Sequence, residues 1–207
     1  MRSTQISILD VGIGNINSVA KALSYLNIEY EIISSNEQLD DARRIIFPGV
    51  GSFDVAVSKL KKLEMFGLLK EKILSGVPYL GICLGMQLLA SRGTEGIGAS
   101  GLEIISGEVN RIQIPSNERL PHIGWNSVSI SDSCLFNGIE DNSDFYFVHS
   151  YCMLPKDADQ AFYTDYYGAV CAYVKKGNAF GVQFHPEKSQ KVGLRLLENF
   201  YNYSEEC

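Results

Sequence analysis

Several features that mark other protein classes are absent from this sequence of 207 residues. Its five cysteines are an odd number and include no C-x-x-C pair, so neither a disulfide framework nor a zinc site is indicated. It has no dense basic run, and its formal charge of -6 makes nucleic acid an unexpected partner. Because its first residues lack the apolar segment of a signal peptide, we expect a cytoplasmic protein.

Long hydrophobic runs are also missing. The longest apolar stretch, residues 77–90, is interrupted by Pro78, Gly81 and Gly85 and is shorter than the roughly 20 residues of a membrane-spanning helix. We therefore expect no membrane segment. Hydrophobic residues make up 45% of the chain and charged residues 20%, as in ordinary globular proteins, and no linker or repeat divides it. These features predict a single domain over residues 1–207.

The first half of the sequence alternates strand-like and helix-like segments. Apolar residues at helical spacing predict helices at 16–26, 53–63 and 65–74. Buried strands are expected at 6–11, 29–33, 43–47 and 79–82. This alternation predicts an α/β fold with a mostly parallel central sheet, helices on both faces, and ligands beyond the carboxyl ends of the strands.

From Gly107 onward the pattern changes to shorter strand-like runs. We expect these extra strands at 108–114, 127–130, 145–151, 170–175 and 179–184, where they either extend the central sheet or form a second one. A last helix is predicted from an apolar face formed by Val192, Leu196, Phe200 and Tyr203.

The segment Gly81-Ile82-Cys83-Leu84-Gly85 places a thiol between two glycines, where a predicted strand meets a predicted helix at 84–90. Glycines at these positions permit the strained turn of a nucleophile elbow, and a helix N-terminus favours a thiolate. The alternative is a buried cysteine that only packs in the core. The other four cysteines lack this context, and we assign them no chemistry.

A thiol nucleophile needs a base, and the sequence offers three histidines, His122, His149 and His185. His185 follows a predicted strand in the segment His185-Pro186-Glu187, where Glu187 is suited to orient the imidazole. We expect His122 and His149 to be packing or hydrogen-bonding residues.

Acyl transfer also needs hydrogen-bond donors for an oxyanion. The turn at 48–51, Pro-Gly-Val-Gly, follows a strand that we expect to end near Cys83. Its backbone N–H groups, with that of Leu84, would form such a hole, although the same sequence is equally suited to a turn without function.

Together these motifs resemble the triad class of glutamine amidotransferases, with P-G-V-G at 48–51, G-I-C-L-G-M-Q at 81–87 and H-P-E at 185–187. Four further segments are similar to the glutaminase subunit of imidazole glycerol phosphate synthase. They are D-V-G-I-G-N at 10–15, P-H-I-G-W-N at 121–126, F-V-H-S-Y at 147–151 and Q-F-H-P-E-K-S at 183–189. The resemblance spans nearly the whole chain.

The resemblance implies a glutamine amidotransferase-like α/β domain that hydrolyses glutamine to glutamate and ammonia without a metal or cofactor. The ammonia would pass to a (β/α)8-barrel cyclase subunit, with which the chain would form a heterodimer. In that family the cyclase makes imidazole glycerol phosphate and an aminoimidazole carboxamide ribotide in histidine biosynthesis.

The resemblance also assigns roles by position. Cys83 is implied to be the nucleophile, His185 the base and Glu187 the residue that orients it. The N–H groups of Val50 and Leu84 are the implied oxyanion donors. The implied glutamine-binding residues are Gly51, Gln87, Glu95, Ser150 and Tyr151. The implied partner-facing residues are Asn15, His122, Trp125, Tyr146 and Lys188, although Trp125 and Tyr146 are equally suited to a core and Lys188 to a solvated surface.

The sequence departs from the family pattern at two places. Val11 stands where the family often has an aromatic residue, and residues 91–94 are a less typical approach to Glu95. Neither place touches the triad. They leave open a paralogous glutaminase that supplies ammonia to amidate a surface sugar. A triad hydrolase of similar architecture and a non-catalytic interaction subunit also stay open.

Overall fold

The computed structural model describes residues 5–204 of the chain, and its largest sheet has seven strands. These strands are β1 Ile6–Leu9, β2 Tyr30–Ile33, β3 Ile45–Gly49, β4 Tyr79–Cys83, β11 Gln160–Asp165, β12 Ala169–Lys176 and β13 Ala179–Val182. Their order is β11-β12-β13-β4-β3-β1-β2. The five strands from β13 to β2 are parallel, whereas β12 and β11 are antiparallel to their neighbours. The predicted mostly parallel central sheet is confirmed.

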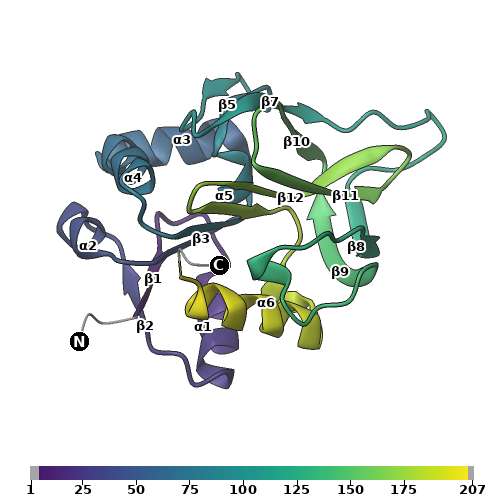
Figure 1. The fold of residues 1–207 in the computed structure, drawn as a ribbon. Coiled ribbons are helices and arrows are strands. Elements are labelled where there is room, and N and C mark those ends of the chain that lie inside the picture. Colours follow the sequence, from purple (N-terminus) through teal and green to yellow (C-terminus); the bar gives the residue numbers. More distant parts are fainter. Residues whose placement is uncertain (1–4, 205–207) are drawn as a thin grey trace.

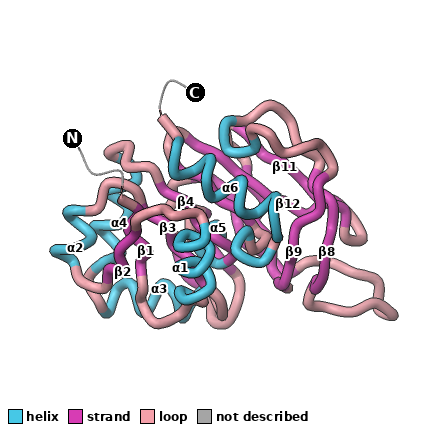
Figure 2. The backbone as a smooth tube through the Cα atoms, turned by 90° about the horizontal axis from the view of Figure 1, so that it is seen from below, coloured by secondary structure: helices cyan, strands magenta, loops and turns pink. Residues whose placement is uncertain are grey.

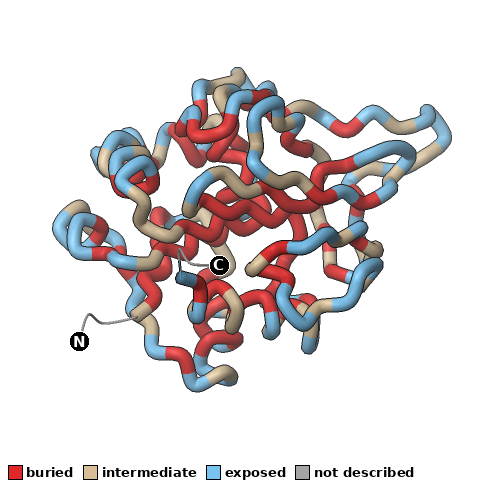
Figure 3. The backbone as a smooth tube through the Cα atoms, in the orientation of Figure 1, coloured by how far each residue is buried: buried red, intermediate tan, exposed pale blue. Residues whose placement is uncertain are grey.

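Each strand of the sheet alternates its side chains between two hydrophobic cores, one on each face. In β3, for example, Ile45 and Phe47 belong to one core and Ile46 to the other. The first core is covered by α2 Asn36–Asp41, α3 Phe53–Lys62 and α4 Met65–Leu74, and the second by α1 Ile16–Tyr25 and α6 Gln190–Asn202 (Figures 1 and 2). Buried residues therefore concentrate along the central strands (Figure 3).

Two smaller sheets stand beside the main one. A four-stranded sheet has the order β10-β7-β5-β6, with β5 Ala90–Gly93, β6 Ala99–Ser100, β7 Ile105–Arg111 and β10 Tyr151–Pro155. A two-stranded sheet pairs β8 His122–Val128 with β9 Ser143–His149. The remaining short helices are α5 Leu84–Gln87, η1 Cys134–Phe136 and η2 Pro186–Lys188. Among the strands predicted in the second half, some extend the central sheet and others form separate sheets, so both alternatives occur.

A helix was expected at 84–90, but α5 ends at Gln87, so the predicted length is wrong. The carbonyl of Leu88 accepts a hydrogen bond from Leu102 N, and that of Leu89 accepts from Ile104 N and Ile105 N. These carbonyls belong to sheet-like pairing rather than to a helix, so Ala90 begins β5 instead.

The expected strand at 145–151 is two strands, β9 and β10, and the one expected at 127–130 begins earlier, as β8. Helix α2 and strands β5, β6 and β11 were not predicted from the sequence. Helix α2 carried a readable signal, because Ser35 and Gln38 form a capping box in which each side chain accepts a hydrogen bond from the other residue's backbone. Two of the missed strands, β5 and β6, are only four and two residues long, and β11 is half-exposed.

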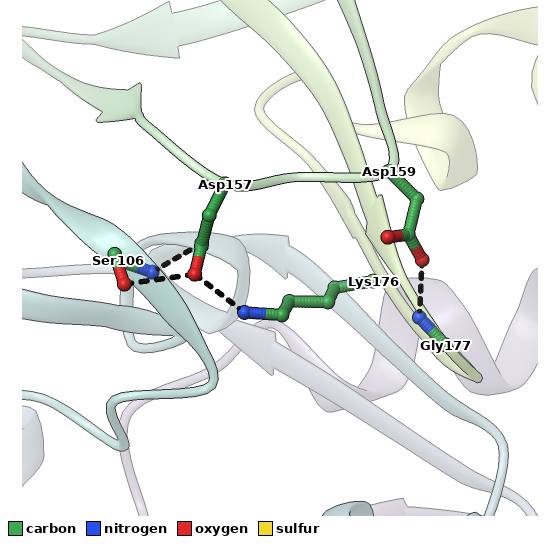
Figure 4. A network of polar contacts seen from close by, with 5 residues as sticks. All are labelled: Ser106, Asp157, Asp159, Lys176 and Gly177. Atoms are coloured by element: carbon green, nitrogen blue, oxygen red, sulfur yellow. Dashed lines mark hydrogen bonds and ion pairs between the residues drawn. The ribbon is translucent and has the colours of Figure 1, made fainter.

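A surface network ties the four-stranded sheet to the main sheet (Figure 4). Asp157 accepts hydrogen bonds from Ser106 N (2.7 Å) and Ser106 Oγ (2.8 Å) and pairs with Lys176 Nζ at 2.6 Å. Asp159 accepts from Gly177 N at 2.8 Å, so the β10–β11 connection is held to both β7 and the β12–β13 turn. The hydrogen bonds of Lys176 and Ser106, and the charge of Lys176, lower the pKa of the Asp157 carboxyl.

Within residues 5–204, no helix is both long enough and apolar enough to cross a membrane. Cys83, Cys152 and Cys171 are free thiols. Among the residues that the structure describes, no cluster of three or more His, Cys, Asp or Glu side chains is arranged to hold a metal ion.

Candidate functional site

Cys83 sits at the junction of β4 and α5 in a strained backbone conformation. Its φ is 54° and its ψ is -105°, a region that residues other than glycine rarely adopt. Such strain persists only where the surrounding structure enforces it, and it is concentrated at functional sites. The strained turn aims the thiol at the carboxyl end of the parallel strands, which is where ligands of such sheets bind.

The two glycines around Cys83 are required by close packing. A Cβ at Gly81 would collide with the backbone of Gly85, and a Cβ at Gly85 would collide with the carbonyl oxygen of Phe47. No side chain fits at either position because the obstacle is backbone in both cases. The G-x-C-x-G spacing is therefore a packing requirement of this turn.

His185 and Glu187 form a buried pair beside Cys83. The His185 Nδ1 atom lies 2.8 Å from Glu187 Oε1, and the two side chains are only 3% and 1% exposed. Burial by itself lowers the pKa of His185, but the Cys83 thiol and the Glu187 carboxylate outweigh it and raise that pKa to about 10. Nε2 of His185 is buried without a hydrogen-bond partner in the described part of the chain, so this edge of the ring is left for the thiol.

A cavity of about 220 Å³ lies over Cys83. Every predicted oxyanion and glutamine-binding residue lines it, together with Val148 and His149, which the sequence analysis did not assign to the site. The lining residues are Val50, Gly51, Cys83, Leu84, Gln87, Glu95, Val148, His149, Ser150 and Tyr151. Its size suits a ligand no larger than an amino acid.

A larger cavity of about 570 Å³ lies elsewhere, between β7, β10 and β12. Cys152 lines it, but burial raises the pKa of that thiol to about 11, so it is protonated at neutral pH. The lining residues include no histidine or carboxylate that would activate a nucleophile. Size therefore does not identify the reactive cavity here, whereas the pairing of a thiol with a base does.

The turn predicted at 48–51 is only partly a turn, because Pro48 and Gly49 end β3 and pair with Ile82 and Cys83 of β4. The arrangement of Val50 and Gly51 after this strand differs from the predicted oxyanion hole. The Val50 N–H donates a 2.7 Å hydrogen bond to the carbonyl of Ile13, so it is not free to donate to a ligand over Cys83. Gly51 has a φ of 109°, which glycine adopts easily. Leu84 begins α5, and the first N–H groups of a helix have no acceptor within it. The oxyanion role of Val50 thus requires another arrangement of this turn.

Glu95 carries the carboxylate that lines the cavity. Its Oε2 accepts a 3.0 Å hydrogen bond from the Phe53 N–H, which fixes the carboxylate at the start of α3. Partial burial, and to a lesser degree the charge of Asp54, raises the pKa of Glu95, while the Phe53 N–H acts in the opposite direction. A cationic ligand group bound next to this carboxylate would reverse that shift.

His149 of the cavity lining and His122 form a hydrogen-bonded pair, with 3.1 Å between Nδ1 of His122 and Nε2 of His149. His122 is stacked between Phe147 and Tyr166, at ring-centroid distances of 4.7 and 4.0 Å. Burial lowers the pKa of His122 to about 4 and is the main cause that lowers the pKa of His149 to about 3. Both rings are therefore neutral at neutral pH, as expected for packing and hydrogen-bonding residues.

We expect the free energy of unfolding to fall as the pH drops below about 6.5, the pKa of an unperturbed histidine. Below that pH, His122 and His149 bind protons in the unfolded chain but not in the folded chain. Each such histidine removes up to about 1.4 kcal/mol per pH unit until its folded pKa is reached. His185 acts at higher pH, because its contribution is complete below about 6.5 and is lost progressively as the pH rises from about 6.5 to about 10.

Urea unfolding measured between about pH 7 and pH 5 tests this dependence. The variant His149→Asn removes one titrating ring but keeps an amide that can donate to the Tyr151 carbonyl, as Nδ1 of His149 does. Its stability should depend less steeply on pH than that of the wild type. A wild-type stability that is flat over this range would contradict the assignment.

The predicted partner-facing residues do not all share one face. On β8 the side chains alternate, so Trp125 points outward and is 47% exposed, whereas His122 points inward and is 3% exposed. Trp125 packs edge-on against Tyr146 of β9 at 6.0 Å, and Lys188 Nζ lies 5.7 Å from the Tyr146 ring centroid. His122 therefore lies beneath this surface rather than on it.

Asn15 precedes α1, which packs against η2, the short helix that contains Lys188. The outer surface also includes Ile123, which is 59% exposed and pairs with Val148 of the cavity lining. We call Ile123, Trp125, Tyr146 and Lys188 the β8–β9 surface.

The chain has relatives of known description. A family model described as "Glutamine amidotransferase class-I" matches residues 7–203. "Imidazole glycerol phosphate synthase subunit HisH" of Rhodopirellula baltica is 43% identical over 94% of this chain and 96% of the relative. "Imidazole glycerol phosphate synthase subunit HisH 1" of Campylobacter jejuni is 44% identical over 94% of this chain and 98% of the relative.

Solved structures support the same fold at lower identity. "Structure of PurLQS from Thermotoga maritima" contains a chain that matches with a TM-score of 0.74 and 17% identity, covering 96% of this chain and 98% of that one. "Crystal structure of glutamine amidotransferase" matches with a TM-score of 0.73 and 18% identity, covering 95% and 97%. At such identities the match concerns the fold alone. The family model and the close relatives decide the membership: this chain belongs to the class-I glutamine amidotransferase family.

Proposed function

We propose that this chain is the glutaminase subunit of an imidazole glycerol phosphate synthase. In this proposal it is a single domain and works in the cytoplasm. It hydrolyses glutamine and passes the ammonia to a barrel cyclase subunit in histidine biosynthesis. The observation that carries the proposal is the strained Cys83 beside the buried His185–Glu187 pair, in a cavity of amino-acid size. The descriptions of the relatives, each covered over nearly its whole length, supply the pathway.

The chemistry follows from the positions of these groups. The Cys83 thiolate attacks the side-chain carboxamide carbon of glutamine, and the C–N bond breaks as protonated His185 gives its proton to the leaving ammonia. A thioester of Cys83 remains. His185, now neutral, takes a proton from water, which attacks the thioester and releases glutamate and the thiol. Glu187 stabilises the imidazolium at both stages through its 2.8 Å contact with Nδ1.

Substrate orientation rests on the polar groups of the cavity wall. Glu95 is the carboxylate suited to bind the α-ammonium group of glutamine, since ion pairing favours its charged form against partial burial. The backbone of Gly51 and the segment Ser150–Tyr151 line the same cavity and would contact the rest of the amino acid. This arrangement favours free glutamine over a peptide, because the cavity is small.

The β8–β9 surface is suited to receive the partner because it combines exposed apolar side chains with one lysine and is joined to the triad. His185 N donates a 2.9 Å hydrogen bond to the Tyr146 carbonyl, and Ser189 Oγ donates to the His185 carbonyl at 2.7 Å. A partner that contacts Tyr146 would therefore act, through this hydrogen bond, on the position of the segment that contains the catalytic base. Exposed aromatic side chains such as Trp125 are also typical anchors of protein interfaces.

We expect the isolated chain to be a poor glutaminase and a barrel partner loaded with its own ligand to raise turnover strongly. The Val50 N–H is engaged by Ile13, and a missing oxyanion donor typically costs ~10²–10³ in rate. A ligand shifts this arrangement only by favouring the active one. Steady-state glutamine hydrolysis of the chain alone, with partner, and with partner plus ligand measures the effect.

Two variants sharpen this experiment. Trp125→Ala should weaken the activation, whereas Leu74→Ala should leave it unchanged. Leu74 is also an exposed apolar residue, at 65%, but it ends α4 on the far side of the main sheet (Figure 1). Equal turnover in all three wild-type states would refute the coupling and favour a free-standing triad hydrolase. Activation by a different, sugar-modifying acceptor enzyme would identify the paralogous glutaminase instead.

A further inference from the structure

Gln183 is a buried polar residue that has no role in the mechanism described so far. It follows β13, two residues before His185, and its side chain is fully buried. Its backbone N–H donates a 2.9 Å hydrogen bond to the carbonyl of Ala172, which fixes the residue against β12. Its side-chain amide lies between Gln87 and the thiol of Cys83.

The orientation of this amide follows from its neighbours. The carbonyl oxygen of Tyr151 is approached by Nδ1 of His149 at 2.8 Å and by Nε2 of Gln87 at 3.0 Å. A carbonyl oxygen only accepts, so both of these nitrogens must donate. Because Gln87 Nε2 is thereby fixed as a donor, the Gln183 atom that lies 3.0 Å from it must be the acceptor Oε1.

Consequently the nitrogen of Gln183 faces the nucleophile, with 3.5 Å between Nε2 and Cys83 Sγ. Which ring nitrogens of His149 and His122 carry a proton follows from the same argument. Since His149 donates through Nδ1, its Nε2 accepts from His122 Nδ1, and Nε2 of His122 accepts from the Asn126 amide at 3.3 Å. The hydrogen bonds therefore run in one direction, and no member of this set can flip without leaving a buried group unpaired.

We propose that Gln183 is a further catalytic residue of this site, whose amide N–H holds and stabilises the Cys83 thiolate while its carbonyl holds Gln87 against the cavity. This inference rests on the proposed function. The thiolate would lie between two donors, the His185 imidazolium and the Gln183 amide, which share its charge. An amide is suited to this role because its N–H donates a hydrogen bond but is too weak an acid to give its proton to the thiolate.

Two substitutions separate the roles of the amide. Gln183→Glu keeps the length of the side chain and an oxygen for Gln87, but it replaces the donor with a group that repels a thiolate. Gln183→Met keeps the approximate volume and loses both hydrogen bonds. Because hydrogen bonds to charged groups are the stronger ones, we expect a loss of about 10- to 100-fold in thiolate reactivity wherever the donor is absent.

The primary readout is alkylation of Cys83 by iodoacetamide at neutral pH, followed on the Cys83 peptide by mass spectrometry with the full-length chain. The reagent is neutral, so a new charge at residue 183 does not attract or repel it, and the reaction needs neither glutamine nor partner. The expected order of rates is wild type, then Gln183→Met, then Gln183→Glu. If residue 183 only filled space, looser packing would expose the thiol and alkylation would be unchanged or faster.

Glutamine turnover in the complex with the barrel partner gives the second readout. Gln183→Glu should lower kcat with little change in KM, whereas Gln183→Met should lower kcat and also raise KM, because Gln87 loses a partner. Gln160→Met is the matched control: Gln160 also makes two side-chain hydrogen bonds, to the Asp132 carbonyl and with the Tyr173 hydroxyl, on another strand of the same sheet. It should match the wild type in both assays.

The outcomes distinguish this inference from the proposed function. Wild-type alkylation rates in both Gln183 variants, with thermal unfolding showing that they are folded, would overturn the role of Gln183 even if glutamine is hydrolysed. Slowed alkylation in the expected order upholds the role of Gln183 at the thiol. It does so even if no partner ever elicits glutamine hydrolysis, an outcome that would count against the proposed function alone.

Discussion

Cys83→Ala should abolish glutamine-dependent activity of the complex while its activity with added ammonium salts is retained. Removing the nucleophile of a triad leaves only binding and oxyanion effects, so the loss should be roughly 10⁴-fold or more. The partner's own reaction consumes ammonia and does not need the thiol. Alanine is smaller than cysteine and creates no clash at the strained turn, so the fold should persist.

The two activities are measured side by side, with glutamine or with an ammonium salt as the nitrogen source. Cys152→Ala is the matched control, since Cys152 is another buried free thiol but lines the cavity away from the triad. It should retain both activities. Persistent glutamine turnover in purified Cys83→Ala protein would rule out the nucleophile assignment.

His185→Asn should lower glutaminase activity by roughly 10²–10⁴-fold, the usual contribution of a general acid and base. Asparagine cannot carry the proton that His185 takes from the thiol and delivers to ammonia. Glu187→Gln should be less damaging, because an amide oxygen can still accept from Nδ1 while the negative charge is lost. That loss removes one of the two groups that raise the pKa of His185, so the imidazolium becomes less stable.

The control histidines are His122 and His149, which lie close to the cavity but do not pair with the thiol and Glu187. Each is changed to a side chain of similar size, and folding is checked by circular dichroism and thermal unfolding. Glutamine hydrolysis by these variants should exceed that of His185→Asn by a wide margin. If either variant lost as much activity as His185→Asn while remaining folded, the base would be misassigned.

The elements that the sequence predicted well are those with a strong local pattern. The helix predicted at 16–26 is Ile16–Tyr25, and the strand predicted at 43–47 is Ile45–Gly49, two residues further along. Both were recognised because their apolar residues repeat at the spacing of one buried face or form a buried run. Strand Gln160–Asp165 was not predicted because only two of its six residues are buried, and it is defined by its pairing with the strand Ala169–Lys176. The short helix after Cys83 was overestimated because distant residues bind the carbonyls that would have continued it.

The sequence by itself predicted the chemistry proposed for this protein, whereas the tertiary structure decided how its groups are arranged. Neither the thiol between glycines nor the His-Pro-Glu segment is decisive alone, but their joint occurrence and the family resemblance that it carries predicted Cys83, His185 and Glu187 as the triad. That Val50 is bound to Ile13, that His122 faces inward and that Gln183 faces the thiol are contacts between segments far apart in the chain. Such contacts depend on strand pairing and side-chain packing, which no local pattern records.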